Sequence, residues 1–97
     1  MNFDHFLKSL GDSAPPHGIS EALKALWYDR REQWERAHEI VQDETDTTAA
    51  AIHAYLHRKE GDNWNADYWY RKAGRPSFKG SLDAEWSSLA RGECSDD

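Results

Sequence analysis

The chain has 97 residues, a net charge of −6 and five tryptophans among its twelve aromatic residues. A chain of this length buries only about 60 to 65% of the surface of its unfolded state, which excludes a second independent core. The aromatic side chains supply large apolar units, so disorder throughout the chain is also excluded.

Cysteine content and hydropathy predict a cytoplasmic protein. Cys94 is the single cysteine and cannot form a disulfide within the chain. The first residues show no basic segment followed by an apolar run, as a secretory signal would. No apolar stretch approaches the roughly 20 residues needed to cross a bilayer, so no membrane contact is predicted.

The first third of the chain predicts a short helix, a connector and a longer helical region. Apolar residues at helical spacing predict a helix over residues 2–10, which Gly11 ends. Two prolines and a glycine make residues 12–18 a connector, and Ser20 is placed to cap the next helix.

Apolar faces predict helices over residues 21–31 and 33–42, but the join between them is left open. No glycine or proline interrupts it. One long helix is therefore the local interpretation, whereas comparison with the later hairpin predicts a break.

The second half predicts a hairpin and a terminal helix. Residues 43–46 form an acidic turn, and Thr47 or Thr48 caps a helix over residues 48–60, which Gly61 ends. A helix over residues 64–73 follows, closed by Gly74 and Pro76. Ser81 opens a last helix, and residues 92–97 are predicted to be a fraying acidic tail.

These elements predict a single all-α domain of two antiparallel helical hairpins with short N- and C-terminal helices. Its parts are an N-terminal helix and connector (1–18), the two hairpins (19–76), a C-terminal helix (77–91) and the tail (92–97). Residues 58–79 hold six basic and three acidic side chains, whereas both flanking regions are acidic. The overall charge argues against nucleic-acid binding and marks the second hairpin as the electropositive region.

The second hairpin resembles a tetratricopeptide or Sel1-like repeat. The matching residues are Gly61, Ala66, Tyr70, Ala73 and Pro76. The region 21–76 is also similar to a family of short bacterial proteins that share AH, HAYLHR and YWYR segments, found here at residues 37–38, 53–58 and 68–71. The repeat resemblance implies a helical interaction scaffold, and the bacterial family has no assigned activity.

Histidines are the candidate metal ligands. His53 and His57 stand one helical turn apart on the helix 48–60, in a polar strip that also contains Glu60. His38 is expected to face the same strip if the helices are antiparallel. Imidazoles at i and i+4 bind one transition metal, although the HExxH signature is absent. The alternative is that these histidines only hydrogen-bond neighbouring carboxylates or carbonyls.

The leading functional hypothesis is a non-enzymatic protein-interaction or small-ligand-binding module. Aromatic residues surround the helix 64–73, so at least one is expected to be exposed beside arginines that suit a carboxylate or phosphate. The predicted groove binds an anionic ligand or peptide and is lined by His38, His53, His57, Glu60, Trp69, Tyr70, Arg71 and Arg75. The alternative is that the rings are core residues and the arginines face solvent or pair with Asp and Glu residues of the acidic segments.

Two further hypotheses assign the protein to other functional classes. One is a small metal-dependent hydrolase that uses His38, His53, His57 and Glu60 as ligands. The other is a homodimer whose aromatic residues form the subunit interface. No organic cofactor and no catalytic nucleophile is predicted, because Cys94 lies in the tail and no serine has a recognisable motif.

Overall fold

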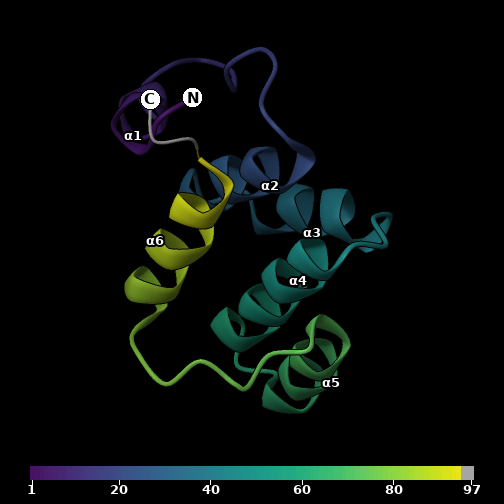
Figure 1. Cartoon of the computed structure of the whole chain (residues 1–97). Coiled ribbons are helices and arrows are strands. Elements are labelled where there is room, and N and C mark those ends of the chain that lie inside the picture. Colours follow the sequence, from purple (N-terminus) through teal and green to yellow (C-terminus); the bar gives the residue numbers. More distant parts are fainter. Residues whose placement is uncertain (95–97) are drawn as a thin grey trace.

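The computed structural model describes residues 1–94, which form six helices and no strand (Figure 1). The all-α prediction is therefore confirmed for the described chain. The helices are α1 (Phe3–Ser9), α2 (Glu21–Arg30), α3 (Trp34–Gln42), α4 (Thr47–Lys59), α5 (Asn63–Ala73) and α6 (Leu82–Glu93).

Helix α4 is the centre of the fold. It packs against α3 and α5 and also contacts α2 and α6 (Figure 1). Its residues Ala49 to Leu56 are all buried, and four of the eight are alanines. Because small side chains let helix axes approach closely, one helix here can contact several neighbours. No described helix is both long enough and apolar enough to cross a membrane.

Three tryptophans join the helices through their indole N–H groups. Trp27 donates to the Ser9 carbonyl, which ties α2 to the end of α1. Trp86 donates to the Leu26 carbonyl and so ties α6 to α2. Trp34 donates to the Leu56 carbonyl over 2.8 Å and ties α3 to α4. Each ring contributes apolar contacts while its polar atom is satisfied.

The open question at the first hairpin is settled by Glu32. This residue has φ +62°, a left-handed backbone conformation that ends α2. The Gln33 N–H bonds to the Tyr28 carbonyl and the Glu32 N–H to the Asp29 carbonyl. The same bond pair surrounds Gly61 and Gly74, so all three turns are Schellman motifs. Helices α2 and α3 are thus separate, although glycine is absent from their join.

Glu32→Gly is expected to stabilise the protein. A left-handed conformation costs a residue with a Cβ atom roughly 1–2 kcal/mol, and the entropy of glycine offsets part of the gain. We expect a net increase of about 0.5–1 kcal/mol in the free energy of unfolding, measured by urea denaturation. Gly61→Ala, which places a Cβ in the equivalent turn, should act in the opposite direction. An unchanged or lower urea midpoint for Glu32→Gly would show that the left-handed conformation of Glu32 does not cost stability.

Two predicted helix ends are wrong. The side chain that caps α4 belongs to Asp46, which accepts from the Ala49 N–H at 2.7 Å, and not to Thr47 or Thr48. Helix α6 continues to Glu93 and includes Gly92, so the tail does not begin at residue 92. Residues 95–97 of the predicted tail lie outside the described residues.

Candidate metal centre

Three histidines meet where α3 packs against α4. His38 lies in the middle of α3, and His53 and His57 lie one turn apart on α4. The His38 and His53 Nε2 atoms are 2.9 Å apart. One ring nitrogen from each histidine lies within 4.8 Å of the others. The predicted meeting of His38 with the α4 histidines is therefore seen in the structure.

Two tryptophans enclose this cluster. The Trp34 ring stacks on His38 at a centroid distance of 4.9 Å. The Trp69 ring from α5 stacks on His53 at 3.9 Å, with 12° between the planes. The His57 ring also stacks on the His53 ring, at a centroid distance of 4.9 Å. These contacts restrict ring rotation, so the imidazole nitrogens are held in position by packing.

Glu60 orients His57. Its Oε1 lies 2.6 Å from His57 Nδ1, with Glu60 at the end of α4. An ionised carboxylate accepts hydrogen bonds and cannot donate them, so Nδ1 of His57 carries the hydrogen of this bond. The lone pair is then on Nε2. This carboxylate–histidine arrangement is the one that commonly supports metal-ligating histidines.

Burial keeps the inner histidines neutral. Loss of solvent lowers the pKa of His53 to about 4, and the neighbouring His38 and His57 act in the same direction. Burial also lowers the pKa of His38, with His57 as the next cause. Neutral imidazole is the form that binds metals, so neither His38 nor His53 has to lose a bound proton to ligate one at pH 7.

His53 contains an unsatisfied polar atom. Its side chain is only 4% exposed, and its Nδ1 has no hydrogen-bond partner. Buried N–H groups without an acceptor are rarer in proteins than acceptors without a donor. The favoured tautomer of the metal-free protein therefore has the proton on Nε2, between His53 and His38, and a metal ion bound at Nε2 would require that proton to move to Nδ1. The polar strip was predicted to lie beside the buried face of α4, whereas His53 is itself buried.

The metal-free protein is expected to lose stability in acid. Histidine in the unfolded chain has a pKa near 6.5, whereas His53 in the folded protein has a pKa of about 4. Between these two pH values His53 is therefore protonated in the unfolded state and neutral in the folded state. Stability should fall across this interval by on the order of 2 kcal/mol, measured by urea denaturation with a chelator present. His17→Ala, which removes an exposed histidine, should leave the fall unchanged. A stability curve that is flat between pH 6.5 and 4.5 would contradict the low pKa.

The structure does not bring all the residues of the predicted groove together. His38, His53, His57, Glu60 and Trp69 belong to the histidine cluster. Tyr70 is buried elsewhere, where its hydroxyl donates to Glu85 at 2.5 Å, and with Arg75 it lines a different small cavity. Arg71 is exposed. A single groove that joins all eight residues is therefore not formed.

Trp34 was missed as a site residue. The signal was its i, i+4 spacing to His38, which places both rings on one face of α3. A scan of protein-family models found no match to the chain, and searches of curated proteins and of solved structures also found none. The tetratricopeptide resemblance thus stays a prediction.

Proposed function

We propose that the protein binds a divalent transition metal ion through His38, His53 and His57. The observation that supports this most strongly is the 2.9 Å separation of the two Nε2 atoms, with the third imidazole beside them. Metal–imidazole bonds are about 2.0–2.1 Å long, so an ion at that distance from both atoms makes an N–metal–N angle of about 90°. A tetrahedral ion would need the two atoms a few tenths of an ångström further apart.

The donor set favours particular metals. Three neutral imidazoles suit zinc, copper, nickel and cobalt, whereas magnesium and calcium prefer oxygen ligands. Three protein ligands also leave positions for water or another small ligand. His38 and His57 are only partly buried, so the cluster is not fully closed to solvent.

Binding is favoured over hydrolysis. The hydrolase hypothesis uses Glu60 as a ligand, yet its carboxylate is hydrogen-bonded to the far side of His57. In that position Glu60 fixes the ring and raises the basicity of the ligating nitrogen. Glu60 therefore positions His57 and lies outside the coordination sphere of the metal.

Titration of the metal-free protein with Co²⁺ and Zn²⁺ tests the proposal. Expected results are one ion per chain by calorimetry and a visible Co²⁺ absorption spectrum typical of nitrogen ligation. Because Trp34 and Trp69 touch the ligands, Cu²⁺ should also quench tryptophan fluorescence at equimolar ratio. The double variant with His5→Ala and His17→Ala lacks the two exposed histidines outside the cluster and should bind equally well. Binding that disappears in this control would contradict the proposal.

A further inference from the structure

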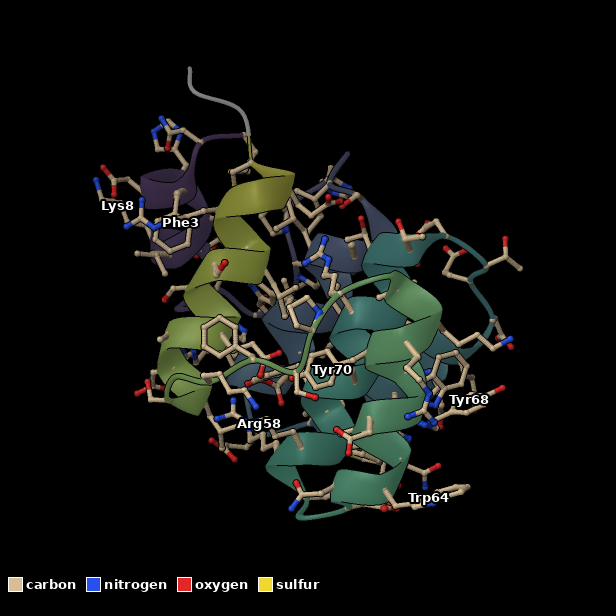
Figure 2. The ribbon with its side chains drawn as sticks, turned by 60° about the horizontal axis from the view of Figure 1, so that its bottom comes forward. Phe3, Lys8, Arg58, Trp64, Tyr68 and Tyr70 are labelled. Atoms are coloured by element: carbon tan, nitrogen blue, oxygen red, sulfur yellow. The ribbon has the colours of Figure 1, made fainter. Side chains whose placement is uncertain are left out.

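The outer face of α5 exposes large aromatic side chains. Trp64 is 77% exposed and Tyr68 is 39% exposed, and both project away from the rest of the protein (Figure 2). Arg71 continues the same stripe, because positions 64, 68 and 71 follow the i, i+4, i+7 spacing of one helix face. Tyr70, in contrast, points inward toward Arg58 (Figure 2). An exposed tryptophan in a stripe of this kind indicates a surface for recognition.

Basic residues lie at the C-terminal end of α5 and in the segment after it. Arg71, Lys72, Arg75 and Lys79 are all exposed, and none of them forms an ion pair within the described residues. Lys72 lies over the Tyr68 ring at 5.6 Å. Four other cations, Lys24, Arg30, Arg58 and Lys59, form ion pairs with carboxylates. Arg71 and Lys72 thus place positive charge that has no ion pair beside the exposed rings.

We propose that the outer face of α5, formed by Trp64, Tyr68, Arg71 and Lys72, docks an acidic amphipathic helix of a partner protein. About two helical turns separate Trp64 from Arg71, roughly 10 Å at 1.5 Å per residue. A partner helix can place leucines against the two rings and carboxylates against the cations. Helical spacing of the stripe and charge complementarity both favour this occupant.

The charge distribution disfavours a long polyanion. The chain has a net charge of −6 in spite of this basic end. A nucleic acid that extended past α5 would meet the acidic regions on either side of it in the sequence. A short acidic helix covers the stripe without reaching those regions. This surface is separate from the proposed metal site, which lies between α3 and α4.

NMR titration of the full chain with three probes tests the proposal. The probes are an 18-residue peptide of leucines at helical spacing with glutamates elsewhere, the same peptide with lysines replacing the glutamates, and oligouridine. The glutamate peptide should shift the Trp64 indole resonance and saturate. Trp64→Ala and Arg71→Glu should each weaken its binding at least fivefold without lowering the melting temperature, because both side chains are exposed. Leu7→Ala and Lys8→Glu on α1 are the matched controls and should change nothing.

Three results would overturn the proposal. The first is an unchanged Trp64 resonance at millimolar glutamate peptide. The second is tighter binding of oligouridine than of the peptide at the same resonances, which would assign the face to a nucleic acid. The third is a protein mass that rises with concentration and returns to the monomer value in Trp64→Ala, which would assign it to a second copy of the chain.

Discussion

Arg58→Ala is expected to lower the free energy of unfolding by about 3–5 kcal/mol, the usual cost of removing one partner of a buried ion pair. The Glu85 side chain is only 3% exposed, and its Oε1 is 2.8 Å from Arg58 Nη1. The other oxygen accepts from the Tyr70 hydroxyl. Without the guanidinium, the carboxylate stays buried with one hydrogen bond and no counter-charge. The second guanidinium nitrogen also bonds to the Gly80 carbonyl, so the linker before α6 loses an anchor.

Two variants separate this cost from simple loss of a side chain. Lys24→Ala removes an exposed pair with Glu21 and should cost less than about 1 kcal/mol. Glu85→Gln added to Arg58→Ala removes the unpaired charge and should restore part of the stability. Urea denaturation at pH 7 measures all three. If Arg58→Ala costs no more than Lys24→Ala, the buried pair does not stabilise the fold.

This pair also shows what sequence periodicity does not detect. Arg58 and Glu85 are 27 residues apart, and Asp29 meets Tyr55 and Lys59 across 26 and 30 residues. Periodicity describes which face of a helix is apolar, but the pairing of polar groups depends on how helices cross. The apolar stripe of α4 and the glycine ends at Gly61 and Gly74 depend only on local sequence, so they were predictable.

The candidate site was partly predictable for the same reason. The i, i+4 spacing of His53 and His57 is local, and the antiparallel hairpin brought His38 to them as expected. Tyr70 follows Trp69 directly, yet a rotation of about 100° per residue directs one ring to His53 and the other to Glu85. Sequence proximity therefore placed both in one groove, whereas helix geometry assigns them to different neighbours.

Glu32 is the other instructive failure of local rules. Turn preferences reserve a left-handed position for glycine, and its absence favoured a continuous helix at residues 31–33. Helix α2 nevertheless ends there, because Trp34 donates to the Leu56 carbonyl and fixes the start of α3. Burial of Ala37 and Val41 in the core fixes the rest of α3. Tertiary contacts offset the local strain, which no local pattern reveals.

His38→Ala is expected to weaken Ni²⁺ or Zn²⁺ binding by at least about 100-fold, because one of three ligands is lost. This position is informative because His38 is only partly buried and packs on Trp34, so the fold should tolerate the change. His57→Ala should weaken binding similarly, whereas Glu60→Gln should weaken it by about 10-fold, since it changes only the partner of His57 Nδ1. Calorimetry on each metal-free variant measures the affinities, and circular dichroism confirms that each is folded.

The order of these effects distinguishes a metal site from a hydrogen-bonded histidine cluster. A metal site requires the ligand variants to lose more affinity than Glu60→Gln, and it requires bound metal to raise the melting temperature of the wild type but not of His38→Ala. A cluster that is held only by hydrogen bonds would show no saturable binding, and its melting temperature would be the same with metal or chelator. Equal affinity in the wild type and His38→Ala would place any bound ion elsewhere, because the 2.9 Å contact that suggests the site includes His38 directly.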